Sequence, residues 1–110
     1  MRIGAVAGML ALAMLPSVCV AASGDAAVGK DTFHQKCAAC HGPEGKGDGP
    51  AAKVAKLTMP DLGSKEVQSL SDASIKKVIT EGKDKMKAVP GLSGSDLSNL
   101  VAFIRTLAKK

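Results

Sequence analysis

The chain has 110 residues, a formal net charge of +5, no Trp or Tyr and only two Phe. A chain of this length forms one small domain with a thin core. The positive charge is modest, and the chain lacks the aromatic residues that alternate with basic ones in a groove for single-stranded nucleic acid. We therefore expect no nucleic-acid partner.

The first 22 residues have the organisation of a secretory signal peptide. Arg2 gives a positive start, residues 3–15 form an apolar region, and residues 20–22 form a small-residue cleavage site. We therefore expect a signal peptide at residues 1–22, export, and one domain at residues 23–110. A retained membrane anchor is the alternative, but the apolar stretch is short and is broken by Pro16. Lipid attachment at Cys19 is disfavoured, because the residues before it fit a lipoprotein cleavage site poorly.

A helix is predicted over residues 26–40, with Asp25 as its N-cap. The spacing of Val28, Phe33, Cys37 and Cys40 is compatible with such a helix. This helix carries the most informative motif of the chain at its end.

Residues 37–41 form the motif C-x-x-C-H, which is typical of c-type haem attachment. The thiols of Cys37 and Cys40 can each add to one haem vinyl group, and a gap of two residues on a helical turn matches the spacing of the two vinyls. His41 would then lie beneath the iron as its proximal ligand. A buried macrocycle would also supply the bulk that a core without Trp or Tyr lacks.

Two other uses of these side chains compete with haem attachment. A redox-active disulfide between Cys37 and Cys40 would need a βαβ context, and no strand-like run lies nearby. A zinc site could be assembled from His34, Cys37, Cys40 and His41. Neighbouring Cys40 and His41 would reach one tetrahedral ion with difficulty, and the usual zinc spacings are absent.

Residues 42–50 contain four glycines and two prolines, and they are predicted to form a tight loop. We interpret the loop as chain that wraps past a haem edge, with a merely flexible loop as the alternative. It is no phosphate loop, because both the Gly-Lys-Ser/Thr ending and a preceding strand are missing. Short helices are expected at residues 51–57 and 64–70, with an extended segment at 58–62 between them.

The last third of the chain contains two stronger helices. Ser71 begins the first, and Gly82 follows it as a C-cap. After a loop at residues 83–92, Ser93 and Asp96 have capping-box spacing before an apolar stripe that ends near Leu107. No strand pair or repeat is present. We therefore expect an all-α fold, with short helices around one haem and with the first and last helices packed together.

With these features in place, the chain resembles the class I c-type cytochromes, the small soluble monohaem cytochromes c of bacteria. The resemblance covers the C-x-x-C-H motif, the glycine-rich loop, the helix ending at Gly82, the methionine loop and residues 100–107. It implies the cytochrome c fold, in which Gly29 and Phe33 of the first helix pack against Phe103 of the last. Independently, Gly29 would permit close helix crossing, because it has no side chain.

The resemblance further implies a methionine as the second axial ligand of the iron. Met59 and Met86 both lie far enough from His41 along the chain to pass around a haem. Met86 matches the family's ligand loop, because it follows Gly82 by a few residues. An open or otherwise filled distal site is the remaining alternative.

In similar proteins the carbonyl of a proline after the haem loop accepts a hydrogen bond from the proximal histidine. Gly49-Pro50 is the best match for that role, and Pro43 is an alternative. Such a bond would fix the ring of His41 and raise its donor strength.

A haem bound by both His41 and Met86 has no open position, so the resemblance implies electron transfer and no enzymatic activity. We expect a periplasmic, monomeric one-electron carrier that meets membranes only through membrane-bound redox partners. Lys83, Lys85 and Lys87 would steer an acidic docking surface of such a partner, with a solvated face of no function as the alternative. The rival functions are a haem-based ligand sensor or weak peroxidase with a labile distal site, and an electron-port subunit of a larger oxidoreductase.

Overall fold

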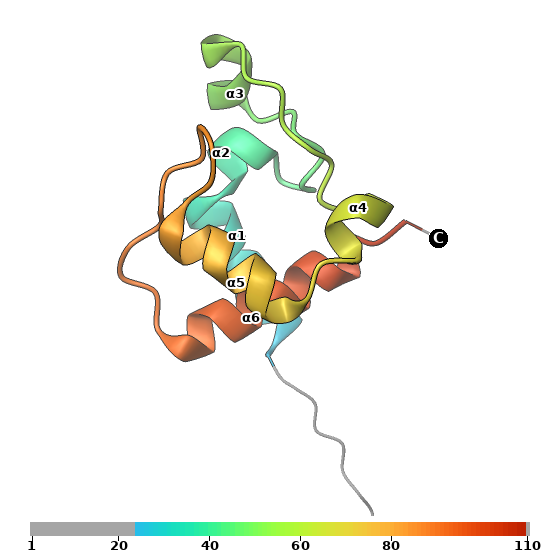
Figure 1. Ribbon diagram of the computed structural model, residues 1–110, viewed down its shortest axis with the longest axis vertical. Helices are drawn as coiled ribbons and strands as arrows, with labels where there is room; N and C mark the ends of the chain where they lie inside the picture. The colour runs from blue at the N-terminus through green and yellow to red at the C-terminus, as the bar shows by residue number, and fades with distance from the viewer. Residues whose placement is uncertain (1–23, 110) are drawn as a thin grey trace, which may run out of the picture.

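The computed structural model describes residues 24–109, so the predicted signal peptide and Cys19 lie outside the described residues. This part of the chain is helical and contains no strand, which confirms the all-α prediction (Figure 1). None of its helices has both the length and the apolar character needed to cross a membrane. The helices are α1 (Ala26–Lys36), α2 (Ala38–His41), α3 (Pro50–Ala55), α4 (Lys65–Gln68), α5 (Asp72–Glu81) and α6 (Gly94–Thr106).

The three longest helices begin where the sequence predicts. The side chain of Asp25 accepts hydrogen bonds from two backbone N–H groups in the first turn of α1, and the Ser71 side chain accepts one from the Ser74 N–H in α5. Ser93 and Asp96 form a complete capping box at α6. Each cap satisfies donors that the first helical turn leaves unpaired. Gly82 ends α5, as expected.

The first predicted helix is interrupted at Cys37, which differs from the continuous helix expected over residues 26–40. Cys37 has φ −124° and ψ −29°, outside the helical region, and it separates α1 from α2. Its carbonyl accepts hydrogen bonds from the N–H groups of Cys40 and His41 at 3.2 and 2.9 Å. The motif therefore forms a turn of its own. Val28 on α1 is 45% exposed.

The core is centred on the crossing of α1 and α6, as the resemblance implied. Phe33 and Leu100 are fully buried, and the rings of Phe33 and Phe103 lie 5.0 Å apart between centroids. Gly29 makes this crossing close, because a Cβ atom there would overlap the carbonyl oxygen of Asn99. Close packing of these apolar side chains stabilises the contact between α1 and α6, the first and last helices.

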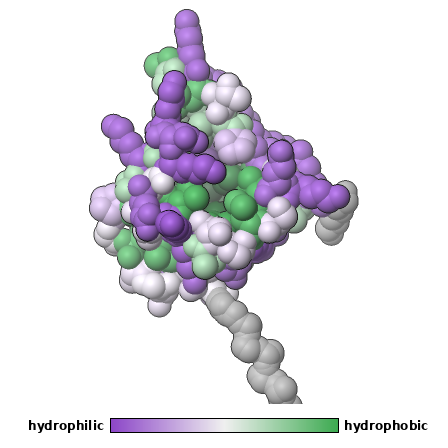
Figure 2. Space-filling model, viewed as in Figure 1, coloured by the Kyte–Doolittle hydropathy of each residue, from purple (hydrophilic) through white to green (hydrophobic). Residues whose placement is uncertain are grey.

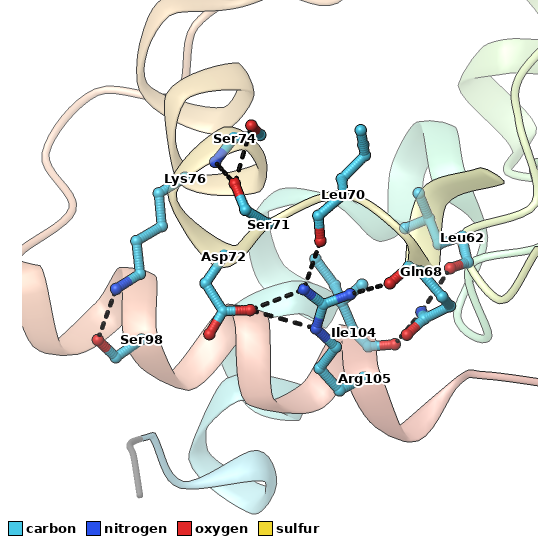
Figure 3. A network of polar contacts seen from close by, with 10 residues as sticks. All are labelled: Leu62, Gln68, Leu70, Ser71, Asp72, Ser74, Lys76, Ser98, Ile104 and Arg105. Carbon is cyan, nitrogen blue, oxygen red and sulfur yellow. Dashed lines mark hydrogen bonds and ion pairs between the residues drawn. The ribbon is translucent and has the colours of Figure 1, made fainter. Parts of the chain in front are cut away.

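The segment between α4 and α5 is tied to α6 by Arg105 (Figure 3). Its guanidinium donates hydrogen bonds to the carbonyls of Gln68 and Leu70, at 2.8 and 2.7 Å, and forms an ion pair with Asp72 at 2.7 Å. Three elements thus share one planar group, whose fixed donor geometry suits several acceptors at once.

Helix α3 stands apart from the α1–α6 core at the top of the view in Figure 1 and packs against α2. Pro50 occupies its first turn, where a missing N–H is harmless. Lys56 ends it with φ +57°, and Val54 is 85% exposed. The short helix predicted at residues 51–57 is confirmed, shifted by one or two residues.

Candidate haem-binding site

A cavity of about 1340 Å³ opens between the motif turn, the segment that follows α3, and the loop that follows α5. Its volume exceeds the roughly 300–1,000 Å³ of ordinary small-molecule pockets. Figure 2 shows the hollow with hydrophobic residues at its floor and hydrophilic residues at its sides. Cys37, Cys40, His41 and Met86 all line it, and so does Met59. The structure therefore brings together all five candidates for holding a haem, and the lining of the cavity does not distinguish between the two methionines.

The two cysteines are free thiols at the start and near the end of the motif turn. Burial raises the pKa of the Cys37 thiol to about 11, and the opposing effect of the Lys36 charge is smaller. The Cys37 thiol is therefore less acidic than that of an ordinary exposed cysteine. Within residues 24–109 no three His, Cys, Asp or Glu side chains are grouped so that they could hold a metal ion. The four side chains of the zinc alternative, His34, Cys37, Cys40 and His41, therefore do not form such a group.

His41 has a nearly buried imidazole, with 8% of the residue exposed. Burial lowers its pKa, because the cationic form loses hydration. The ring is therefore neutral at physiological pH and has a lone pair available for a metal. Its Nδ1 atom is buried without a hydrogen-bond partner.

The hydrogen bond expected between His41 and a proline carbonyl is not formed, so that prediction is wrong for both Pro50 and Pro43. The Pro43 carbonyl instead lies 3.1 Å from Nε2 of His34. The Pro50 carbonyl lies in the first turn of α3, where the helix supplies the partners of backbone carbonyls. His34 is exposed and does not line the cavity.

The glycine-rich loop folds back over the motif turn. Gly47 donates a backbone hydrogen bond to the His41 carbonyl at 2.7 Å, and Gly49 donates one to the Cys40 carbonyl at 3.1 Å. These bonds satisfy carbonyls that the end of α2 leaves unpaired. The loop therefore supports the backbone on which Cys40 and His41 sit, which argues against a merely flexible connection.

Gln68 holds one wall of the cavity, a role that the sequence did not indicate. Its amide nitrogen donates to the carbonyls of Leu62 and Ile104, at 2.8 and 2.9 Å (Figure 3). Leu62 lines the cavity, and its own N–H donates to Gly45 at 2.7 Å. One side chain thus connects the cavity wall to α6. A single Gln in a helix of four residues carries no periodic signal that could have revealed this.

Met86 and Met59 are held by different parts of the chain. Met86 lies in the loop after α5, where it exchanges two backbone hydrogen bonds with Lys83. Met59 follows α3, and its backbone packs closely on Gly47, in the loop that bonds to the His41 carbonyl. Both are half-buried.

Lysines dominate the charged residues that line the cavity. They are Lys36, Lys56, Lys83, Lys85 and Lys87, against the acidic Glu66 and Asp84. In the described part of the chain none of these lysines forms an ion pair with a carboxylate. The rim therefore has an excess of positive charge.

Comparison with known proteins identifies the family. Residues 24–104 match a family described as cytochrome c oxidase, cbb3-type, subunit III. Cytochrome c-554(547) of Halothiobacillus neapolitanus is 38% identical over 90 residues, which are 77% of this chain and 99% of that protein. The chain belongs to the c-type cytochromes. The solved structure of the KustC0563 c-type cytochrome is similar to this chain, with a TM-score of 0.61 and 25% sequence identity. The match covers 74% of this chain and 98% of that one.

Membership confirms the resemblance, the cytochrome fold and the cofactor expected from the sequence. The cytochrome carries covalently bound haem c and serves haem-based electron transfer with redox partner proteins. The residues in the cavity fit such a group, because they include two free thiols and a buried neutral imidazole with an unpaired nitrogen.

Proposed function

We propose that this cytochrome is a periplasmic one-electron carrier, in which haem c is joined to Cys37 and Cys40 and its iron is bound by His41 and Met86. The observation that supports this assignment is that these four side chains line one cavity. No other cavity-lining residues combine two thiols with a neutral imidazole on a single turn of the described chain.

Bound haem supplies a one-electron couple at its iron. Cys37 and Cys40 fix it to the motif turn, and His41 provides a nitrogen ligand whose backbone is supported by the glycine-rich loop. Met86 would provide the second protein ligand of the iron, which would leave no coordination site for a substrate, so we infer no enzymatic activity. A thioether ligand also raises the reduction potential relative to a second histidine.

Met86 is favoured over Met59 by the segments that hold them. Met59 packs on the loop that supports His41, whereas Met86 lies in a separate loop that follows α5. A methionine-ligated ferric haem has a weak near-infrared charge-transfer band. We expect Met86→Ala to abolish this band and Met59→Ala to keep it. The reverse result would make Met59 the ligand. A wild-type protein without the band would favour the ligand-sensor or peroxidase alternative.

The proposed location and oligomeric state have direct tests. The apolar region and small-residue site before residue 23 support export with cleavage after Ala22. N-terminal sequencing of the protein from the periplasmic fraction should begin at Ser23. Gel filtration of the haem-loaded protein should give a monomer. A start at Met1 in the membrane fraction, or a dimer at micromolar concentration, would contradict these statements.

The lysine rim supports docking of a partner with an acidic surface. Long-range attraction between such surfaces raises association rates and weakens with salt. We expect reduction by a physiological donor to slow with ionic strength and in Lys85→Glu. Lys30→Glu makes the same charge change on an exposed position of α1 away from the cavity lining, and it should have a smaller effect. Equal rates in both variants at all salt concentrations would exclude this docking surface.

A second candidate is favoured by the matched family, which is described as an oxidase subunit. The cytochrome would then serve as the electron port of a larger oxidoreductase. Affinity purification of the tagged cytochrome from detergent-solubilised membranes distinguishes the two. Stoichiometric recovery with other oxidoreductase subunits would support the port, and recovery of the cytochrome alone would support the free carrier.

A further inference from the structure

Met86 ends a tight turn that uses both of its backbone polar groups. Its N–H donates to the Lys83 carbonyl at 2.8 Å, and its carbonyl accepts from the Lys83 N–H at 3.0 Å. Within the turn, Asp84 adopts φ +53°, a left-handed conformation that Asp and Asn tolerate better than other side chains. The backbone position of Met86 is therefore determined by the turn.

Gly82 fixes this turn against the end of α5. It has φ +80°, and a Cβ atom there would lie 2.6 Å from the Met86 carbonyl oxygen and 2.9 Å from the Ala88 nitrogen. Further along the loop, the N–H of Val89 donates to the Ile79 carbonyl at 2.9 Å. Ile79 is a buried core residue. The chain on either side of Met86 is thus anchored to a helix that is itself part of the core.

We propose that Gly82 and Asp84 are positioning residues for the Met86 thioether, which rests on the proposed ligation by Met86. Neither residue would bind the iron itself. Both act through the backbone of Met86. Any side chain at Gly82 must push the Met86 carbonyl away by several tenths of an ångström, and this displaces the sulfur in the cavity. Axial ligation tolerates such a displacement poorly, because a positioned ligand needs its supporting contacts.

Gly91 provides a matched control for Gly82. It has φ +79°, so alanine meets the same backbone strain, but a Cβ atom there has no heavy atom within 4 Å. In the ferric holoprotein we expect Gly82→Ala to lose most of the near-infrared band and to have a lower reduction potential. Gly91→Ala should keep both properties. Equal behaviour of the two variants, whether both keep or both lose the band, would overturn the proposal.

Asp84 gives a second test that does not disturb the core, because its side chain is exposed. Valine disfavours a left-handed conformation and asparagine tolerates it, while both remove the same charge. We expect Asp84→Val to weaken the band and Asp84→Asn to retain it, with similar far-ultraviolet circular dichroism. This pair decides the matter if Gly82→Ala fails to fold. Full retention of the band and the potential in Asp84→Val would overturn the role of the turn.

Met86→Ala, measured in parallel, separates this proposal from the one it rests on. If Met86→Ala loses the band while Gly82→Ala keeps it, ligation by Met86 stands and the positioning role of Gly82 is wrong. If Met86→Ala keeps the band, the ligand assignment is wrong and the positioning role falls with it.

Discussion

Replacement of Gly29 by alanine tests the crossing of α1 and α6, on which the position of the haem-attachment turn depends. In an ordinary helix interior this change stabilises by about 1 kcal/mol. Here the added Cβ would overlap the carbonyl of Asn99 in the α6 backbone, and no rotamer can relieve that overlap. The helices must separate, which loosens the packing of Phe33 against Phe103.

The magnitude follows from these opposing effects. Overpacking of a well-packed site costs about 1–3 kcal/mol. Partial loss of the buried aromatic contact adds to this, because full burial of one such side chain stabilises by about 1.5–3 kcal/mol. After the helix-propensity gain is subtracted, we expect Gly29→Ala to destabilise by about 2 kcal/mol. For a domain of this size that lowers Tm by roughly 8–16 °C.

Thermal unfolding of the haem-loaded protein, followed by far-ultraviolet circular dichroism, measures this change. Gly94→Ala is the matched control, because Gly94 is also helical and a Cβ atom there has no heavy atom within 4 Å. It should leave Tm unchanged or raise it slightly. A Gly29→Ala protein as stable as the wild type would refute the inference that the two backbones meet at Gly29.

Three further changes test separate interactions. A hydrogen bond from Lys109 and one from a backbone N–H lower the pKa of the Asp61 carboxyl. This pair therefore stabilises the fold above the unfolded pKa and loses its contribution as the pH falls through the lower folded pKa. Asp61→Asn should lower Tm at neutral pH but not in acid, and a pH-independent difference would contradict the ion pair. Gln68→Leu leaves two carbonyls without their donor and should lower the free energy of unfolding in guanidinium by about 1–3 kcal/mol. Gln35→Leu, on the exposed face of α1, should lower it far less. Equal losses of stability in the two variants would exclude the bridge. Ser93→Ala removes the capping box and should cost about 0.5–2 kcal/mol in the same assay, and an unchanged midpoint would contradict that role.

Local chemistry explains what the sequence predicted well. The caps at Asp25, Ser71 and Ser93 depend on residues within one helical turn, so their spacing along the chain is sufficient. The C-x-x-C-H motif is equally local, because both thiols and His41 lie on one turn. The resemblance added the contact of Phe33 with Phe103, which joins distant parts of the chain and could not have been derived from periodicity.

Features that depend on tertiary contacts were not predictable in the same way. The interruption at Cys37 and the bridge from Gln68 to the carbonyls of Leu62 and Ile104 involve backbone geometry that no local pattern encodes. The expected proline partner of His41 is absent, because backbone carbonyls take partners according to the path of the loop. The left-handed conformation of Asp84 follows from the turn that closes at Met86, which single-residue propensity does not determine.

The mass of the peptide that contains residues 37–41, taken from protein made with competent haem-maturation machinery, tests whether haem is covalently attached to the motif turn. We expect one haem on this peptide and no thiol available for alkylation at Cys37 or Cys40. A peptide of unmodified mass in which both cysteines can be alkylated would contradict covalent attachment at this turn, and with it the proposed site.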